Sequence, residues 1–414
     1  MVEEPDKNGL KPTNPDLLPG DQAVSAPTTP ADTSTTLPVF LLDPACLSQL
    51  RARVAEGDPS FDTAFKTLIS NANLALTADP FSVTFKPQTP PSGTKHDYMS
   101  QARYWWPDPT TTDGLPYLSK DGQNNPEILK IPDHTSLDHM IVAVNHLSLA
   151  YYLTGDQHYA TKAASLIRTW FLNPTTAMNP NMDYAQMIPG HTEVQGYGII
   201  DSRELSRLID DIGLLAGSSA WTTTDQTNLQ IWFTRYLHWL QTSDKGRAAA
   251  KTVNNHQTWY RVQVAPIALF LGNKMLATQI IHDTQALIAD QINTDGSQRH
   301  EITRADGWNY SNFNLDVLFR LAAIGEKVGV DLWNYQTSDG RGLRKALDFI
   351  LPATIDHRQW SYTVGSPWDN VAATTLFHVA SNSYTSRAYR TLSEQIKKPS
   401  FNAAIEQLWY PALF

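Results

Sequence analysis

The residues best suited to chemistry lie in the segment 254–260, which reads Asn-Asn-His-Gln-Thr-Trp-Tyr. It places two side-chain amides, an imidazole and two aromatic rings directly before an apolar run, residues 262–271, that has the composition of a buried helix. Polar groups are costly to bury without partners, so such a cluster at the start of a core helix indicates a ligand site.

A second polar segment, residues 299–312, also precedes an apolar helical run, residues 315–324. It contains Arg304, Trp308 and Tyr310, whose side chains offer a cation, an aromatic face and a hydroxyl. We predict that the two polar segments face each other across one pocket.

Helices must position both segments, because apolar residues recur with helical spacing from residue 134 onward and no alternating strand pattern competes with them. Asp43 as N-cap and Pro44 at the first helical position predict an earlier helix, and another is expected over 59–76. The later helices are expected at 134–153, 157–172, 201–216, 224–242, 256–271, 274–292, 312–328, 340–350, 370–380 and 385–397.

Two stretches of the chain resemble each other, residues 153–161 and 271–278. In each, a long apolar helix ends at Gly, a polar cap opens the next helix, and Ala-Thr follows in its first turn. Recurring helical hairpins are typical of a solenoid or a closed ring. We predict an all-α fold, an (α/α) toroid of about five to seven hairpins, because long loops can then gather at one end as a cleft.

The composition limits the alternatives. Residues 1–37 are rich in Pro, Thr, Ser and Asp, which predicts a disordered or loosely attached arm before a single catalytic domain at 38–414. With 32 Lys and Arg against 41 Asp and Glu, the net charge of -9 argues against nucleic-acid binding. No apolar run reaches membrane-spanning length, and the single Cys46 rules out an internal disulfide.

A long loop region, residues 79–133, precedes the main helices and carries a dense aromatic group. Loops of this length inside a domain are usually functional. Tyr104, Trp105 and Trp106 are therefore expected to stack on sugar rings, although ordinary packing within the loop is the alternative.

The order of these motifs resembles the alginate lyase superfamily of α/α-toroid polysaccharide lyases. The resemblance rests on Asn254-Asn255-His256 with its following aromatic pair, and on Arg304 and Tyr310 downstream. The loop from Asp97 to Tyr117, with its Tyr-Trp-Trp-Pro-Asp-Pro core, resembles the branch that includes glucuronan lyases.

This resemblance implies roles for single residues. Asn255 is similar to the family's carboxylate-neutralising amide, His256 to its catalytic histidine, Arg304 to its substrate-carboxylate arginine and Tyr310 to its catalytic tyrosine. The segment between Arg304 and Tyr310 is one residue shorter and less basic than in alginate-specific members, so glucuronan and alginate rich in mannuronate both stay open as substrates.

Further contacts to the sugar chain are expected from aromatic, amide and cationic side chains in the same regions: Tyr104, Trp105, Trp106, Arg203, Asn254, Trp259 and Trp308. Arg203 has an equally plain alternative as part of a solvated helix face. The resemblance implies no metal and no cofactor, an anionic polysaccharide as partner, a monomer, and a secreted or periplasmic protein whose signal peptide has been removed.

The implied reaction explains why these residue types occur together. β-Elimination removes the proton on C5 of a uronate, which becomes acidic only when the neighbouring carboxylate is neutralised. Amide, imidazolium and guanidinium donors can do this. When the C5 proton and the leaving O4 lie on one face of the sugar, a single tyrosine can act as base and acid; on opposite faces, His256 takes the proton and Tyr310 returns one.

Two other functions fit parts of the pattern. A glycoside hydrolase needs two opposed carboxylates, for which Glu301, Asp306, Asp210 and Asp211 are the candidates. A non-catalytic polysaccharide-binding protein would keep the aromatic residues but has no need of the Asn-His-Arg-Tyr set. A metal site at His134, Asp138, His139 and His146 is disfavoured, because His139 and His146 lie on different helical faces.

Overall fold

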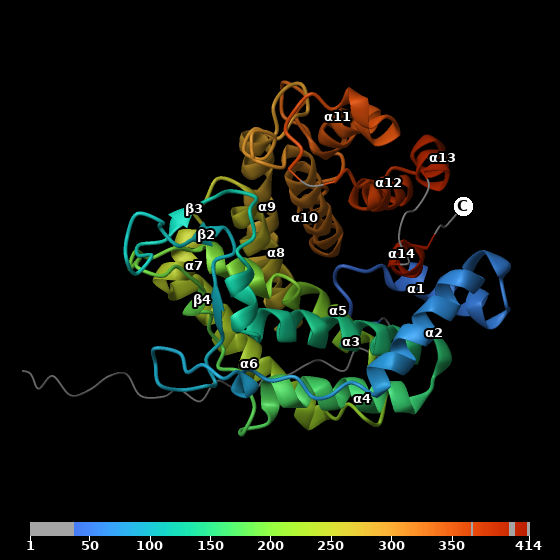
Figure 1. Ribbon diagram of the computed structural model, residues 1–414. Helices are drawn as coiled ribbons and strands as arrows, with labels where there is room; N and C mark the ends of the chain where they lie inside the picture. Colours follow the sequence, from blue (N-terminus) through green and yellow to red (C-terminus); the bar gives the residue numbers. More distant parts are fainter. Residues whose placement is uncertain (1–36, 366, 397–401, 412–414) are drawn as a thin grey trace, which may run out of the picture. The chain divides into compact units, whose positions relative to one another are not determined.

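The computed structural model describes residues 37–365, 367–396 and 402–411 (Figure 1). All of them belong to one unit of the chain, Thr35–Phe414. The predicted arm, residues 1–37, lies outside the described residues except for Leu37.

The described part of the chain is built from fourteen α-helices. They are α1 (Pro44–Ala55), α2 (Asp62–Leu76), α3 (Asp133–Thr154), α4 (Gln157–Ile167), α5 (Leu205–Leu214), α6 (Thr223–Thr242), α7 (Asp244–Ala249), α8 (Asn255–Phe270), α9 (Lys274–Gln291), α10 (Gly307–Val328), α11 (Leu343–Ile355), α12 (Val371–Ser383), α13 (Arg387–Gln395) and α14 (Asn402–Trp409). Short helical turns are η1 (Pro59–Phe61), η2 (Val83–Phe85), η3 (Pro126–Lys130), η4 (Arg168–Leu172), η5 (Tyr197–Ser202) and η6 (His357–Gln359).

The helix signals read from the sequence are confirmed at several ends. The Asp43 carboxylate accepts a hydrogen bond from the Ala45 backbone N–H at 2.7 Å and so caps α1. The two similar stretches form matching hairpins, α3–α4 and α8–α9, with Gly155 and Gly272 at φ of +74° and +77°. Only glycine adopts this left-handed conformation at low cost, which explains why it ends both first helices.

The start of α10 differs from the predicted position at residue 312. The Asp306 side chain accepts a hydrogen bond from the Asn309 N–H and caps a helix that begins at Gly307. Tyr310 therefore lies in the first turn of α10, and Arg304 lies just ahead of the helix.

Two small sheets were not predicted. β1 (Met99–Gln101) pairs in parallel with β4 (Tyr184–Met187), and β2 (Trp105–Trp106) pairs antiparallel with β3 (Leu118–Ser119). Strands of two to four residues are too short to show an alternating pattern in the sequence. They hold the aromatic loop region in a fixed conformation.

The helices form the predicted (α/α) toroid. Helices α3, α5, α8, α10 and α12 each pack on the next along this series, while α4, α9 and α13 pair with α3, α8 and α12 (Figure 1). Helix α14 packs on both α2 and α12. Two hydrophobic clusters meet at α8, because Val264 and Ile267 belong to one and Val262 and Ala265 to the other.

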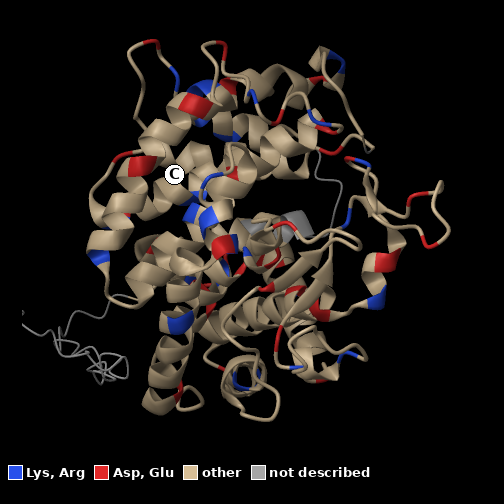
Figure 2. Cartoon of the chain, turned by 90° about the vertical axis from the view of Figure 1, so that its left-hand side faces the viewer, with Lys and Arg blue, Asp and Glu red and all other residues tan. Residues whose placement is uncertain are grey.

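Charged residues of both signs are interspersed over the helices and loops (Figure 2). The net charge of -9 is therefore compatible with a local cluster of cationic residues around a pocket. Among the described helices, none combines the length and the apolar composition that crossing a membrane requires.

Asp210 and Asp211 on α5 are 0% exposed, which corrects their assignment as possible cleft carboxylates. The Asp210 carboxylate accepts backbone N–H bonds from Phe40, Leu41 and Leu42 at 2.7, 2.9 and 2.7 Å. Burial raises the pKa of Asp210 to about 6, while the three backbone N–H bonds favour its ionised form. Asp210 ties the first described segment of the chain to the toroid.

Replacing Asp210 with Ala should lower the free energy of unfolding by about 2 to 4 kcal/mol, because three backbone N–H groups, two of them buried, lose their acceptor. Asp43→Ala, which removes a helix cap at the surface, should cost only about 1 kcal/mol. Denaturant unfolding followed by circular dichroism measures both. Equal losses of unfolding free energy in the two variants would contradict the role of Asp210 in holding residues 40–42.

Asp211 makes a different contribution, because its carboxylate accepts one bond, from the Asn145 amide at 2.9 Å, and burial raises its pKa to about 8. A folded-state pKa above the unfolded value favours the protonated form, so stability is greatest below pH 4 and falls as the pH rises through about 8. The free energy of unfolding of Asp211→Asn should exceed that of the wild type at pH 9 by at least about 1 kcal/mol, and the difference should be clearly smaller at pH 5. Parallel stability curves from pH 5 to 9 would refute this account.

Candidate active site

The first polar segment forms the N-terminus of α8. Asn254 is the N-cap, and its side-chain oxygen accepts a bond from the His256 N–H at 3.2 Å. Asn255 is the first helical residue and is 1% exposed. Its backbone N–H and its side-chain amide both donate to the Glu301 carboxylate, at 2.6 and 2.8 Å. Helix geometry and Glu301 thus fix the orientation of Asn255.

One pocket of about 460 Å³ brings the two polar segments together with the aromatic loop region, as predicted. Its lining residues are Ala102, Arg103, Tyr104, Trp105, Ser119, Asp121, Gln186, Tyr197, Ile200, Arg203, Asn254, Asn255, His256, Arg304, Tyr310 and Phe313. The side chains of Asn255, His256, Arg304 and Tyr310 therefore share one cavity, with Tyr104, Trp105, Arg203 and Asn254 around them.

Three aromatic residues expected at the substrate are not among those that line this pocket. The indole N–H of Trp106 bonds to the Gln123 carbonyl at 2.9 Å. Trp259 is 1% exposed and Trp308 is 0% exposed. Unlike the equally buried Asn255, neither ring lines the pocket, so the structure does not support the sugar contact predicted for Trp259 and Trp308.

The helices explain why Trp259 and Trp308 are buried. Trp308 precedes Tyr310 by two residues, or roughly 200° around α10, and it stacks on Trp368 at 4.1 Å between ring centroids. Trp259 follows Asn255 by one helical turn, deeper in the toroid, where Arg320 lies 5.0 Å from its ring.

The imidazole of His256 is neutral at pH 7. Burial, and then the positive charges of Arg304 and Arg103, lower the pKa of His256 to about 4 against the attraction of Asp201. The ring of Tyr197 lies 5.0 Å from the imidazole, at an angle of 59°. The sequence had suggested an imidazolium, whereas the free protein holds an uncharged ring that can accept a proton.

Arg304 is held by an acidic partner that the sequence did not reveal. Its Nε and Nη2 atoms donate to the Asp121 carboxylate at 2.9 and 2.7 Å. Its guanidinium carbon lies 3.9 Å from the centre of the Tyr310 ring. Arg304 therefore faces the tyrosine ring, with two of its donors already committed to Asp121.

The Tyr310 hydroxyl donates a hydrogen bond to the Tyr104 hydroxyl at 2.9 Å. Burial and this bond raise the pKa of Tyr310 well above its usual value, and they outweigh the lowering effect of Arg304. Tyr310 thus retains its proton in the free protein.

Several pocket residues were missed from the sequence. Arg103 bonds to His134 at 3.0 Å and adds a cation beside Tyr104. Gln186 has φ of +46°, and its side-chain amide donates to Asp201 at 2.7 Å. A strained non-glycine residue of this kind is common at functional sites. The loop composition marked the region of Arg103, while nothing in the sequence pointed to Gln186.

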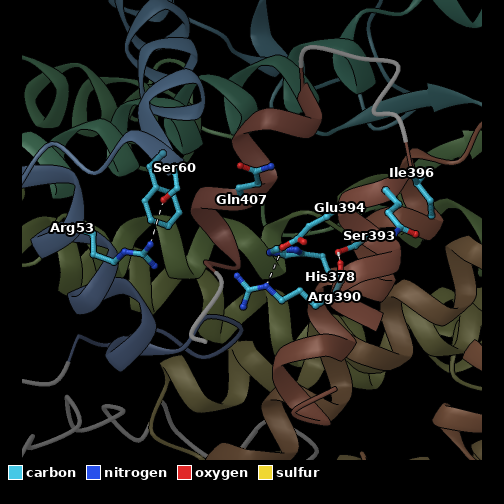
Figure 3. Close-up of a pocket in the computed structure, with 10 residues that line it drawn as sticks. Arg53, Ser60, His378, Arg390, Ser393, Glu394, Ile396 and Gln407 are labelled. Carbon is cyan, nitrogen blue, oxygen red and sulfur yellow. Dashed lines mark hydrogen bonds and ion pairs between the residues drawn. The ribbon is translucent and has the colours of Figure 1, made fainter. Parts of the chain in front are cut away.

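A second pocket of about 440 Å³ lies between η1 and helices α12, α13 and α14, away from every predicted site residue (Figure 3). Its two arginines each face an acid: Arg53 pairs with Asp58 at 2.7 Å, and Arg390 with Glu394 at 3.0 Å. This local compensation makes it a poor site for a polyanion. Across the described ranges, no group of three His, Cys, Asp or Glu residues is arranged to hold a metal ion.

Comparison with known proteins gives a consistent picture. The family model described as alginate lyase matches residues 82–360. The crystal structure of an alginate lyase from Bacteroides ovatus is 34% identical, with a TM-score of 0.86, over 91% of this chain and 99% of that one. No curated protein sequence matches this chain.

Alginate lyase A1-III from Sphingomonas species A1 is more distant, at 17% identity with a TM-score of 0.61 over 91% of this chain and 97% of that one. A histidine-to-alanine variant of the same enzyme, solved with a tetrasaccharide, is also 17% identical, with a TM-score of 0.61 over 93% and 99% of the two chains. At this level of identity the likeness shows the shared fold.

Proposed function

This chain belongs to the alginate lyase family of polysaccharide lyases, and we propose that it cleaves a 1,4-linked polyuronate by β-elimination. The proposed substrate is glucuronan or alginate rich in mannuronate, and the products carry a 4,5-unsaturated uronate end. The observation that carries this proposal is the convergence of Asn255, His256, Arg304 and Tyr310 on one pocket from the starts of two helices.

Neutralisation of the substrate carboxylate is assigned to the α8 N-terminus and to cations beside it. Asn255 offers an amide N–H, and an approaching carboxylate raises the pKa of His256 toward the protonated donor form. Arg103 and Arg203 line the same pocket and attract the polyanion. Arg304 acts chiefly on Tyr310, since Asp121 already occupies two of its donors.

Tyr310 supplies the proton for the leaving O4, because it lines the pocket and retains its proton in the free protein. The group that removes the C5 proton depends on the sugar. Where the C5 proton and O4 lie on one face of the sugar, Tyr310 first loses its phenolic proton to solvent, and the phenolate then takes the C5 proton and passes it to O4. Where they lie on opposite faces, the neutral imidazole of His256 takes the C5 proton and Tyr310 donates its own proton to O4.

Aromatic rings at the pocket provide the sugar contacts. Tyr104 and Trp105 come from the β2 region, and Tyr197, which is 43% exposed, lies against His256. Flat rings cover the apolar faces of sugars, so these three residues define the proposed path of the chain together with Asn254 and Arg203. Because such polymers do not cross membranes, we propose that the protein acts outside the cytoplasm.

The test is a screen of the purified protein against alginate, glucuronan, pectate and hyaluronan, followed by ultraviolet absorbance of the new C4–C5 double bond. We expect absorbance to rise with glucuronan or mannuronate-rich alginate. New reducing ends without absorbance would instead indicate a hydrolase, which the burial of Asp210 and Asp211 makes a poor fit. Binding without turnover would indicate a non-catalytic module.

Activity should survive extended dialysis against EDTA, because neutralisation is assigned to Asn255, His256 and the pocket arginines. The measurement is the initial rate of absorbance increase before and after chelation. A rate that falls at least tenfold and returns on addition of calcium or zinc would overturn this assignment.

A further inference from the structure

Glu301 lies directly behind the α8 N-terminus and is 1% exposed. Its two carboxylate oxygens bond to one residue, since Oε1 accepts from the Asn255 backbone N–H at 2.6 Å and Oε2 from the Asn255 side-chain Nδ2 at 2.8 Å. Glu301 is not among the residues that line the pocket, whereas Asn255 is.

This pairing determines which end of the Asn255 amide meets the substrate. Burial raises the pKa of Glu301 to about 7, while the two bonds from Asn255 and the charge of Arg304 favour its ionised form. An ionised carboxylate only accepts hydrogen bonds, so the Nδ2 atom faces Glu301, as the 2.8 Å contact shows. Nδ2 carries two hydrogens, and one of them is committed to Glu301. The second hydrogen is then held in a fixed direction as the donor available to a substrate carboxylate.

The charge of Arg304 favours an ionised Glu301 next to Asn255. Arg304 Nη1 lies 4.0 Å from Glu301 Oε2, and the opposite side of that guanidinium bonds to Asp121. Arg304 thus sits between two carboxylates, one of which also holds Asn255. Arg304 partly offsets the negative charge of ionised Glu301.

We propose that Glu301 is the positioning residue for Asn255: it fixes the amide so that an N–H, and not the carbonyl oxygen, points at the uronate carboxylate. The proposal rests on the proposed lyase function. It assigns Glu301 no contact with the sugar and no proton transfer, unlike its earlier interpretation as a hydrolase carboxylate.

The experiment is a double-mutant cycle on kcat with Glu301→Gln, Asn255→Ala and the combination, using the polyuronate on which the wild type is most active. The Gln side chain has the same size but offers one acceptor and one N–H donor to two donors of Asn255, so the pairing must break. We expect Glu301→Gln to lower kcat about tenfold or more with little change in KM, as for a misoriented group.

Because Glu301 acts through Asn255, Glu301→Gln should cost almost nothing more in the Asn255→Ala background. Asp211→Asn is the matched control, since Asp211 is also a buried acid bonded to an asparagine amide but lies on α5 in the core; its kcat should stay within about twofold of the wild type. Melting temperatures of all variants report on folding.

Two results would overturn the proposal: a Glu301→Gln enzyme with most of its kcat, or losses that multiply in the double variant. If Glu301→Gln does not fold, Glu301→Asp takes its place in the cycle, because the shorter side chain cannot reach both donors; the same two results decide. A wild type that forms no unsaturated product on any polyuronate refutes the proposed function itself, and this is known before any variant is made.

Discussion

Tyr310→Phe should lower kcat by at least about 10²-fold while leaving KM nearly unchanged, because the hydroxyl supplies the proton for the leaving oxygen. The structure strengthens the reason for this expectation. The hydroxyl bonds only to that of Tyr104 among the contacts described, so its removal leaves one phenol without a donor and disturbs little else. The ring remains against Arg304, 3.9 Å away, so packing is retained.

The control for this variant is Tyr260→Phe. Tyr260 is also on α8 near the pocket segment, but its hydroxyl bonds to the Leu240 carbonyl at 3.3 Å in the core. Loss of that hydroxyl should cost on the order of 1 kcal/mol of stability and leave kcat within about twofold. A Tyr310→Phe enzyme that behaves like this control would remove Tyr310 from the mechanism.

Local sequence signals predicted the helices that carry the site, because caps and glycine stops act within a few residues. The ends of the α3–α4 and α8–α9 hairpins followed from Gly155 and Gly272. The start of α10 was placed too late, because Asp306 and Gly307 look like loop residues until the Asp306 side chain is seen to cap the helix. A polar segment ahead of a core helix can therefore form the first turn of that helix.

Partners far apart in the chain could not be predicted in this way. Asp121 and Arg304 are separated by 183 positions, and Asp210 bonds to residues about 170 positions earlier. No spacing rule connects such residues, since the toroid alone brings them together. The charge state of His256 was missed for the same reason: its pKa depends on burial and on Arg304, Arg103 and Asp201, which come from three different parts of the chain.

Burial also separates the aromatic residues that meet substrate from those that do not. Trp105 and Trp308 look alike in the sequence, yet one lines the pocket and the other is 0% exposed. Trp105 lies on the short strand β2, whereas Trp308 lies on α10, roughly 200° around the helix from Tyr310.

His256→Ala should lower kcat/KM by about 10²- to 10³-fold, the usual loss when a donor or base at the reacting centre is removed. The role of His256 is then read from His256→Gln, which keeps an N–H donor but cannot accept a proton to become a cation. On a uronate with the C5 proton and O4 on one face, Tyr310 transfers both protons and His256 only donates. On such a uronate, the kcat/KM of His256→Gln should therefore be about tenfold or more above that of His256→Ala.

In a guluronate-rich polymer the C5 proton and O4 lie on opposite faces, so His256 must take the C5 proton. On this polymer His256→Gln should be no more active than His256→Ala. The two protonation states found in the free protein, a neutral imidazole with a pKa of about 4 and a protonated Tyr310, suit this base and acid pair without further change. The one-face reaction must instead generate the Tyr310 phenolate after substrate binds, so its rate should rise more steeply with pH. Initial rates of both variants on the two polymer classes between pH 6 and 9 test this assignment, and an equal response to Gln on both classes would contradict it.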